Sequence, residues 1–357
     1  MKVDRPKIKF TIHGVRMRKE LLAWYDSNQR DLPWRRSADP YRIWLSEVML
    51  QQTRVAAILE HYRTFLARFP TVQKLAAAPL DSVLAAWSGL GYYRRARSLH
   101  RAAQQIVARH GSRLPRTVPE LRALPGVGLY TSTAVASIAF AVPVAVVDGN
   151  VKRVISRLLA QSPAADCWAL AESLLERRRP GDWNQAMMEL GATVCLPREP
   201  LCGRCPLLRW CQAFAAAGMK SPGSTVADAF AAAGVLRPSG KAEFAPPGSS
   251  APRRKRHAHV DEAYLLAQRR RSVYLVRRAS HSKLMAGMWE LPRLPAPPSG
   301  REPLFRLKHS ITVTNYEIAV FDAAATPRGG SWVGLERILE LPLTGLTRKI
   351  LRRAKLI

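Results

Sequence analysis

The stretch LPGVGLYTSTAVASIAFA, residues 124–141, decides the fold of this chain. Gly126 and Gly128 permit a tight turn and a close approach of the backbone, and the apolar run behind them predicts a helix. Amides at the start of that helix would face outward, where they can bind an anion such as a DNA phosphate. An ordinary helical turn is the alternative, because LPGVG alone is only moderately specific. We expect a helix–hairpin–helix at about residues 118–141.

The sequence on both sides of this stretch is also typical of helices. Segments such as RVAAILEHYRTFLARF (54–69) and ARSLHRAAQQIVARHG (96–111) carry apolar residues three or four positions apart. Gly and Pro separate these segments, as in SGLGYY and LPGVG. We therefore expect a mainly α-helical region over residues 1–212.

The composition changes after this region. Ala, Gly, Pro and Ser dominate residues 213–255, which predicts a flexible linker. Beyond it, AYLLAQ and SVYLVRR are short β-type runs separated by RRR, which predicts a hairpin. ITVTNYEIAVF (311–321) is another strand-rich stretch, and residues 335–355 read as helical again. Residues 256–357 are thus expected to form a small α+β domain.

The charge of the chain predicts a polyanionic partner. Its 56 Lys and Arg residues exceed its 26 Asp and Glu residues, which gives a net charge of +30. Nucleic acid is the first expectation and an anionic membrane surface the second, although heavy use of Arg and Ala could also be a habit of the genome. The basic run at 253–256 is either a nucleic-acid contact or a solvated linker end.

Nothing in the sequence predicts a membrane location. The N-terminus, MKVDRPKIKF, lacks the apolar core of a signal peptide. The longest apolar run, around residues 134–147, is shorter than the roughly 20 residues that cross a bilayer. We expect a soluble, monomeric, cytoplasmic protein, associated with the nucleoid if it is bacterial.

Four of the five cysteines have the spacing of metal ligands, C-x6-C-x2-C-x5-C: Cys195, Cys202, Cys205 and Cys211. Disulfides are not expected in an intracellular protein. A tetrahedral zinc site and a [4Fe–4S] cluster both use four cysteines, and the spacing does not separate them. Cys167 lies outside this set and is expected to be a small buried residue.

Three arginines accompany this metal motif: Arg198, Arg204 and Arg209. Arg198 lies in the loop LPREPL between the first two cysteines. These cations would suit a loop that contacts phosphates, although arginines at such positions can also be plain surface residues.

Two carboxylates stand in apolar surroundings. Glu47 lies within WLSEVMLQQT (44–53), where burial would raise its pKa and keep it protonated. It is either an acid held in reserve or an accident of a partly exposed helix. Asp148 follows an apolar run in VVDGNVKRV, so it lies either at the edge of a cavity or in an ordinary Asp-Gly-Asn turn.

Taken together, these motifs resemble one family. LPGVG, an apolar helix, VVDGNVKRV and the four cysteines resemble the helix–hairpin–helix DNA glycosylase superfamily. Further motifs, spread over residues 18–211, resemble the MutY-type adenine DNA glycosylases within it: LPWR (32–35), WLSEVMLQQT (44–53), GLGYYRRAR (89–97) and NQAMMELGATVC (184–195). GMWELP (287–292) is similar to part of that family's Nudix-like C-terminal domain.

The resemblance implies an enzyme of base-excision repair. The family excises adenine mispaired with 8-oxoguanine, and also from A·G, in duplex DNA, and it carries a [4Fe–4S] cluster at the four-cysteine motif. By this match Glu47 protonates the adenine and Asp148 stabilises the positive sugar. Tyr130 stands where lyase relatives carry a Lys, which implies a monofunctional glycosylase without efficient strand cleavage. Tyr130 and Asn150 are expected to hydrogen-bond near Asp148.

The resemblance also assigns residues to base and DNA recognition. Gln52 and Tyr92 match positions that wedge into the duplex, and Thr53 and Leu90 match contacts on the 8-oxoguanine side. Tyr92 could instead be an ordinary core aromatic. The adenine pocket would contain Trp34, Arg35 and Gln185, and further DNA contacts would come from Gly126, Gly128 and Arg198. Arg97 and Lys152 are either phosphate contacts or solvated charges.

The C-terminal region departs from the family pattern. In the family, a Phe-Ser-His loop recognises 8-oxoguanine. The matching stretch here is LFRLKHSITVTNYEI (304–318), which carries Leu307 and Lys308 before His309. His309 and Ser310 are carried over as the recognition residues. No cluster of acids follows GMWELP, so we expect recognition without nucleotide hydrolysis.

Three rival functions remain open from the sequence. The chain could be a glycosylase for oxidised pyrimidines or mismatched thymine, although Glu47 and the C-terminal domain argue against this. It could be a non-catalytic DNA-binding protein that keeps the fold and the cluster. A zinc-dependent nucleic-acid module is the third.

Overall fold

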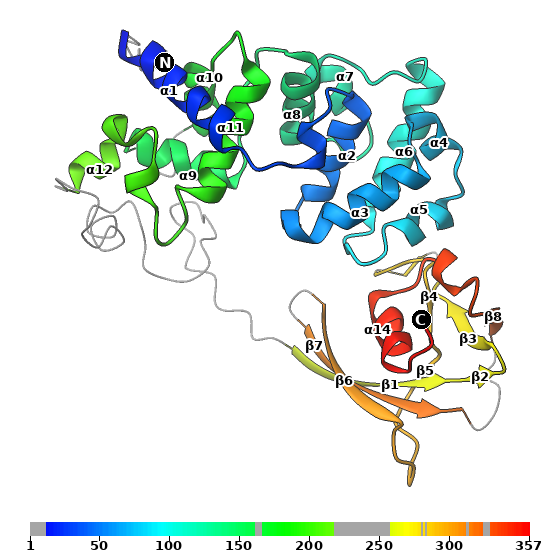
Figure 1. Ribbon diagram of the computed structural model, residues 1–357. Helices are drawn as coiled ribbons and strands as arrows, with labels where there is room; N and C mark the ends of the chain where they lie inside the picture. The colour runs from blue at the N-terminus through cyan, green and yellow to red at the C-terminus, as the bar shows by residue number, and fades with distance from the viewer. Residues whose placement is uncertain are drawn as a thin grey trace, which may run out of the picture. The chain divides into compact units, whose positions relative to one another are not determined.

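The computed structural model describes residues 12–160, 166–217, 258–279, 281–282, 284–311, 314–323 and 329–357 (Figure 1). It divides into two compact units, each built from two stretches of sequence. One unit is Met1–Val48 with Arg113–Ala251, and the other is Met49–Ser112 with Pro252–Ile357. Most of the predicted linker 213–255, and the whole basic run 253–256, lie outside the described residues.

The first unit is helical, as the apolar spacing predicts. Its elements are α1 (Ile12–Asn28), η1 (Pro33–Arg35), α2 (Pro40–Leu50, whose last two residues belong to the second unit), α7 (Val118–Arg122), α8 (Leu129–Phe140), α9 (Gly149–Leu158), α10 (Cys167–Leu174), α11 (Pro180–Thr193), η2 (Cys202–Arg204), η3 (Leu208–Trp210) and α12 (Gln212–Ala216). Leu21, Ile155 and Leu190, from α1, α9 and α11, are almost fully buried in one apolar cluster. Burial of this face holds the helices together.

The predicted helix–hairpin–helix is formed by α7, a tight turn and α8. The Thr117 side chain caps α7 by accepting from the amide of Glu120. Gly126 has a positive φ of 77°, which a side chain would strain. Gly128 is extended at the start of α8, and an added Cβ there would meet no atom within 4 Å. Only Gly126 therefore uses the conformational freedom of glycine.

The second unit contains the remaining helices: α3 (Val55–Arg68), α4 (Val72–Ala77), α5 (Leu80–Ala86) and α6 (Arg94–Arg109). The apolar face of α6, which includes Leu99 and Ile106, packs on α4 and α5. Phe65 meets the fully buried Trp87 edge to face, with 5.8 Å between the ring centroids. These contacts fix the segments that flank α6.

The C-terminal part of the second unit carries two four-stranded sheets. One has the order β5 (Arg293–Leu294), β1 (Ala258–Leu266), β7 (Thr314–Asp322), β6 (Phe305–Ile311), with β1 and β7 parallel. The other pairs β3 (Ser272–Arg277) with β2 (Gln268–Arg269), β4 (Trp289–Glu290) and β8 (Gly330–Gly334). The helical elements η4 (Ile338–Glu340) and α14 (Gly345–Arg353) follow.

The predicted strands are present, with one correction to their pairing. The hairpin around RRR is short, because β3 pairs with β2 and the long AYLLA strand pairs with β5 and β7 in the other sheet. ITVTNYEIAVF is rich in strand as predicted, since its first residue ends β6 and residues 314–321 belong to β7. The α+β class is confirmed, whereas the Nudix-like identity stays a prediction.

The length and polarity of the helices test the expectation that the chain does not cross a membrane. Over the described part of the chain, no helix combines the length and the apolar character needed to cross a bilayer.

Candidate active site and cysteine centre

Glu47 is buried on α2 beside Tyr130 of α8. The Glu47 residue is 5% exposed, and the Tyr130 hydroxyl donates to Glu47 Oε2 at 2.8 Å. The same hydroxyl lies 3.5 Å from the sulfur of Met188 on α11. Three helices therefore meet around one carboxyl group.

The surroundings of Glu47 hold it near its neutral form. The pKa of Glu47 is raised to about 7; burial is the largest cause, and the charge of Asp148 acts in the same direction. The hydrogen bond from Tyr130 and the cation of Arg35 act in the opposite direction. A carboxyl group with this pKa can donate a proton at neutral pH.

Asp148 is the N-cap of α9, so it is both part of a turn and half-buried. Its Oδ1 accepts from the Val151 amide at 2.7 Å, and its Oδ2 accepts from Asn150 Nδ2 at 3.0 Å. Burial raises the pKa of Asp148, and these two hydrogen bonds lower it. The expected bond from Asn150 is present. The Tyr130 hydroxyl, which was expected to bond near Asp148, donates to Glu47, whose pKa the charge of Asp148 raises.

Arg153 connects this carboxylate to the end of α11. One of its terminal nitrogens donates to Asn150 Oδ1 at 2.9 Å and to the carbonyl of Gly191 at 2.6 Å. Its Nε donates to the carbonyl of Cys195 at 2.8 Å. The position of Asp148 therefore depends on α11 as well as on its own helix.

Glu189 is a buried carboxylate that the sequence interpretation missed. Its side chain is fully buried on α11, where it accepts from Arg30 at 2.7 and 2.8 Å and from Arg35 at 2.8 Å. Burial would raise its pKa, but these hydrogen bonds lower the pKa of Glu189 to about 2. Its position inside NQAMMELG is the same signal that singled out Glu47, an acid among apolar residues.

The three predicted adenine-pocket residues all lie in the first unit. Trp34 is 7% exposed in η1, and Gln185 is half-buried on α11, one turn before Glu189. The Arg35 guanidinium lies 5.4 Å from the centre of the Tyr25 ring and is ion-paired with Glu189. Arg35 is thus fixed by contacts within the protein and acts on Glu47 through its charge.

The predicted DNA-probing residues lie in two loops of the second unit. Gln52 and Tyr92 are exposed and have positive φ values of 56° and 47°. Tyr92 is 53% exposed, which rules out the core interpretation of this residue. Leu90 is 7% exposed, so its side chain belongs to the core and a side-chain contact with 8-oxoguanine is not supported. Thr53 is half-buried.

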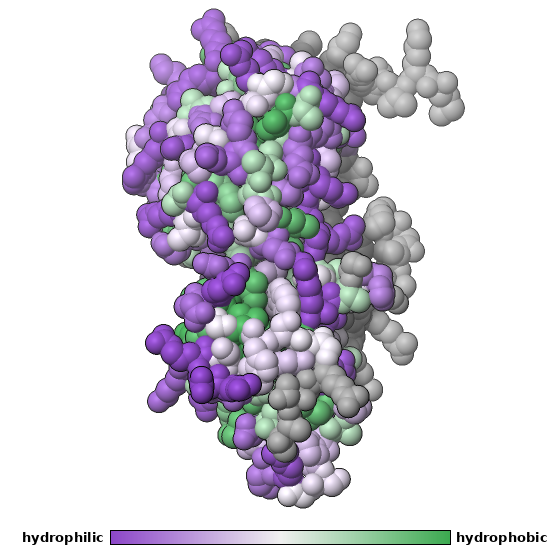
Figure 2. Space-filling view, turned by 90° about the vertical axis from the view of Figure 1, so that its right-hand side faces the viewer, coloured by the Kyte–Doolittle hydropathy of each residue, from purple (hydrophilic) through white to green (hydrophobic). Residues whose placement is uncertain are grey.

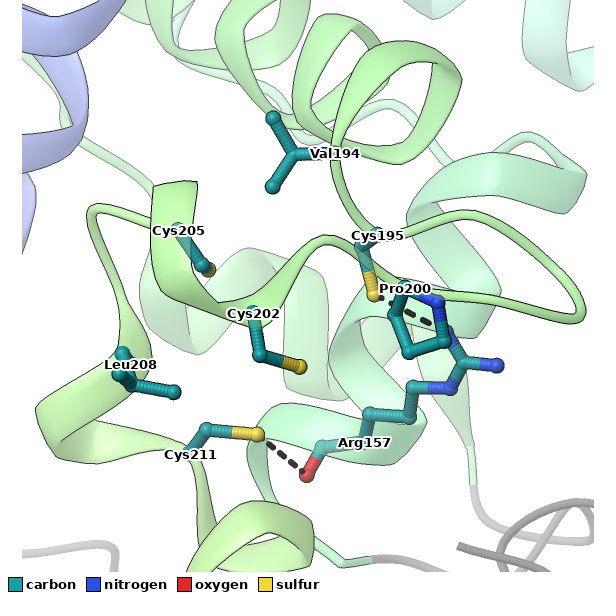
Figure 3. Close-up of a pocket in the computed structure, with 8 residues that line it drawn as sticks. All are labelled: Arg157, Val194, Cys195, Pro200, Cys202, Cys205, Leu208 and Cys211. Carbon is teal, nitrogen blue, oxygen red and sulfur yellow. Dashed lines mark hydrogen bonds between the residues drawn. The ribbon is translucent and has the colours of Figure 1, made fainter. Parts of the chain in front are cut away.

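The four cysteines line one pocket (Figure 3). The other walls of this pocket are Arg157, Val194, Pro200 and Leu208. Arg157 donates to Cys195 Sγ at 3.3 Å and to the Leu196 carbonyl at 2.7 Å. Burial raises the pKa of Cys202 to about 11 and that of Cys205 to about 12.

The donor set of this pocket fits a four-thiolate cluster. All five cysteines of the chain are free, and four of them line this one pocket, which is the number of thiolate ligands that such a cluster uses. Among the described residues, no three His, Cys, Asp or Glu are close enough to hold one metal ion. Arg198, Arg204 and Arg209 are exposed near this pocket, and Cys167 is buried on α10 as expected.

His309 and Ser310 lie in strand β6 rather than in a loop. His309 is half-buried opposite Tyr316 of β7, and burial lowers its pKa. The Ser310 hydroxyl donates to Asn315 Oδ1 at 2.8 Å. Both residues are therefore held by the edge pair of the first sheet.

Comparison with known proteins identifies the family to which this chain belongs. Residues 45–177 match the HhH-GPD superfamily of base excision DNA repair proteins. The chain is 35% identical to the adenine DNA glycosylase of Mus musculus, over 94% of this chain and 77% of that protein. It is 39% identical to the adenine DNA glycosylase of Rattus norvegicus over 80% of this chain, but spans only 61% of that protein's length.

Solved structures show the same fold for the helical part. A thermostable thymine-DNA glycosylase matches with a TM-score of 0.53 and 28% identity, over 57% of this chain and 99% of that one. A trapped endonuclease III–DNA covalent intermediate matches with a TM-score of 0.50 and 24% identity, over 57% and 96%. The helical region thus has the helix–hairpin–helix glycosylase fold.

Proposed function

Because this chain belongs to the adenine DNA glycosylases of the HhH-GPD superfamily, we propose that it excises adenine from duplex DNA. The substrate would be adenine mispaired with 8-oxoguanine or guanine, and the bond hydrolysed would be the N-glycosidic bond. The observation that carries this proposal is the pair of carboxyl groups Glu47 and Asp148 in one helical unit, the first with a pKa raised to about 7.

Glu47 supplies the proton that makes adenine a leaving group. Tyr130 donates to Glu47 Oε2, so the acidic proton of Glu47 is carried by Oε1 and is available to the base. Protonation of the adenine ring lets it depart as a neutral molecule, and the bonding electrons leave with it. The sugar is left as an oxocarbenium-like cation.

Asp148 would stabilise that cation in its ionised form. Its two hydrogen bonds, from Val151 and Asn150, both favour the charged state. They also fix the carboxylate at the start of α9 without a rearrangement during the reaction. The loss of one such electrostatic group costs about 3–4 kcal/mol of transition-state stabilisation in other enzymes.

We infer that the chain is monofunctional. A lyase step needs an amine that forms a Schiff base with the sugar, and Tyr130 offers a phenol. Its hydroxyl is already engaged with Glu47. The abasic product would therefore remain uncleaved until alkali is added.

The four cysteines would hold a [4Fe–4S] cluster, which would order the loop of residues 195–211 when bound. Arg198, Arg204 and Arg209 are exposed in this segment and would contact DNA phosphates.

In the second unit, Gln52 and Tyr92 would enter the duplex. His309 and Ser310 would contribute to recognition of 8-oxoguanine, in a domain that we expect to have no nucleotide hydrolase activity. The enzyme would act on DNA as a monomer.

The decisive experiment is single-turnover release of adenine from duplexes containing A·8-oxoguanine, A·G or A·C, with strand breaks scored before and after alkali. We expect release from A·8-oxoguanine, with breaks that appear only after alkali. Glu47→Gln should slow release by about 100-fold or more. Glu60→Gln is the matched control, because the side chain of Glu60 is 75% exposed.

The rival functions give different results in the same assay. No release from any adenine mispair, with DNA binding intact, would overturn the proposal and favour another lesion or a non-catalytic role. Breaks before alkali would overturn the monofunctional assignment. Release that Glu47→Gln leaves unchanged would remove Glu47 from the mechanism.

A further inference from the structure

Two exposed residues of the second unit share an unusual backbone conformation. Gln52 has φ 56° and Tyr92 has φ 47°, in the left-handed region that residues with a side chain rarely adopt. Neither side chain is held there by burial, because both are exposed. Such a conformation persists only where the surrounding structure imposes it, and strained backbone of this kind clusters at functional sites.

One side chain is bonded to both strained segments. Arg95, in the first turn of α6, directs its two terminal nitrogens at the loop of Gln52 and at the loop of Tyr92. One nitrogen donates to two carbonyls before Gln52, those of Met49 at 2.8 Å and Gln51 at 2.5 Å. The other donates to Thr53 Oγ1 at 3.1 Å and to the carbonyls of Leu90 at 3.2 Å and Gly91 at 3.4 Å.

Aromatic rings complete the surroundings of this guanidinium. Its central carbon lies 5.4 Å from the centroid of the Trp87 ring and 5.4 Å from that of Tyr92. Trp87 is fully buried, and its indole nitrogen donates to the Gly91 carbonyl at 3.1 Å. The planar fork of Arg is needed here, because an ammonium group cannot bond two loops and lie against rings at the same time.

We propose that Arg95 is a positioning residue that locks the Gln52 and Tyr92 loops together as one preformed probe of the duplex. Its charge is used inside the protein to order the two loops before DNA arrives. Preordering removes an entropic cost from binding, so the loops enter the base stack without first having to fold. This inference rests on the proposed function in taking the ligand to be duplex DNA and in taking Gln52 and Tyr92 to enter it.

Arg95 differs in this respect from its neighbours on α6. Arg94 is exposed in the first turn of the same helix and suits a phosphate contact. A phosphate contact would weaken binding and reduce its salt dependence. A positioning role would weaken binding while the salt dependence stays the same.

The test compares Arg95→Lys with Arg101→Lys, since both substitutions keep the charge. We would measure the Kd for a duplex with a non-cleavable adenine analogue opposite 8-oxoguanine, its salt slope, and the fluorescence of a 2-aminopurine placed next to the flipped analogue. Arg95→Lys should raise the Kd by about tenfold and reduce the fluorescence rise, with an unchanged salt slope. Arg101→Lys should behave like the wild type in all three measurements.

Two outcomes would overturn the proposal. One is a wild-type Kd and fluorescence rise in Arg95→Lys. The other comes from Arg95→Gln, which removes the charge: weaker binding with a salt slope less steep by about 0.9 is the signature of one lost phosphate contact.

A second measurement avoids the risk that Arg95→Lys does not fold. Hydrogen exchange of the wild-type protein, free and bound to the same duplex, reports whether residues 51–53 and 90–92 are ordered in advance. We expect slow exchange of both loops in the free protein and little change on binding. Fast exchange that becomes slow only with DNA would contradict a preformed probe. Because neither measurement requires adenine release, failure of the proposed activity would show separately in the excision assay.

Discussion

Two buried carboxyl groups in this chain have opposite ionisation states. Glu47 receives a hydrogen bond from the phenol of Tyr130, whereas Glu189 is paired with the guanidinium groups of Arg30 and Arg35. Burial alone would keep both neutral, so the cations decide the difference between a pKa of about 7 and one of about 2. The ion pairs of Glu189 stabilise the fold above the ordinary Glu pKa, and this stabilisation is lost as the pH falls toward 2.

The raised pKa of Glu47 predicts how adenine release depends on pH. Protonated Glu47 is the active form, so the rate should be constant below about pH 7 and fall tenfold per pH unit above it. Tyr130→Phe removes a hydrogen bond that favours the ionised form, which raises the pKa and moves the fall to higher pH. Single-turnover rates from pH 5 to 9 measure this. A fall that moves to lower pH in Tyr130→Phe would contradict the assignment.

For single carboxyl groups, the sequence predicts which ones are buried, but not which side chains form hydrogen bonds with them. Glu47 and Glu189 both stand among apolar residues of a helix, and both are buried. The two arginines that ionise Glu189 lie 159 and 154 positions away in the chain, so spacing along the helix could not reveal them. The resemblance to the MutY-type family identified Glu47 and Arg35 as site residues, but it did not identify Glu189.

At the scale of elements, the contact of α9 with α11 determines where the Asp148 carboxylate lies. A Cβ added to Gly191 on α11 would lie 2.7 Å from Asn150 Cβ and 3.1 Å from the Asn150 carbonyl oxygen. Asn150 holds Asp148, and Arg153 bonds both Asn150 and the Gly191 carbonyl. Gly191 therefore lets two helices approach closely at the site.

Gly191→Ala should displace Asn150 and slow adenine release. Overpacking at such a contact costs about 1–3 kcal/mol, and we expect an excision rate at least about tenfold lower in the protein that remains folded. Ala192→Ser, at an exposed position of the same helix, is the matched control. Thermal unfolding and single-turnover rates are measured together. A lower melting temperature with an unchanged rate would show that the contact serves stability alone.

Elements with strong local signals were predicted correctly, and elements that depend on distant pairing were not. The helix–hairpin–helix follows from Gly126 and an apolar run that are adjacent in the chain. By contrast, β1 pairs in parallel with β7, which lies about 50 residues further on, and no local pattern indicates that choice. The division of ITVTNYEIAVF between β6 and β7 depends on the same sheet.

At the scale of the whole molecule, charge governs the encounter with DNA. The chain carries a net charge of +30, and Figure 2 shows hydrophilic side chains over most of the face in view, with smaller apolar patches between them. In the proposed function, the positive charge would attract any DNA, whereas the buried groups around Glu47 would distinguish the base. Affinity and selectivity should therefore respond differently to salt.

DNA affinity should fall steeply with salt, and Arg198 should account for part of that fall. Each neutralised phosphate contributes about −0.9 to the slope of log K against log salt concentration. Arg198 is exposed in the loop between Cys195 and Cys202, so Arg198→Gln should weaken binding to matched and mispaired duplexes alike and make the slope less negative by about 0.9.

The control is Arg63→Gln, because Arg63 is exposed and ion-paired with Glu60; it should leave the slope unchanged. Binding isotherms at 50–200 mM KCl measure both variants. A flat response of the wild type would contradict the basic-surface interpretation, and an unchanged slope in Arg198→Gln would remove the cysteine loop from the DNA interface.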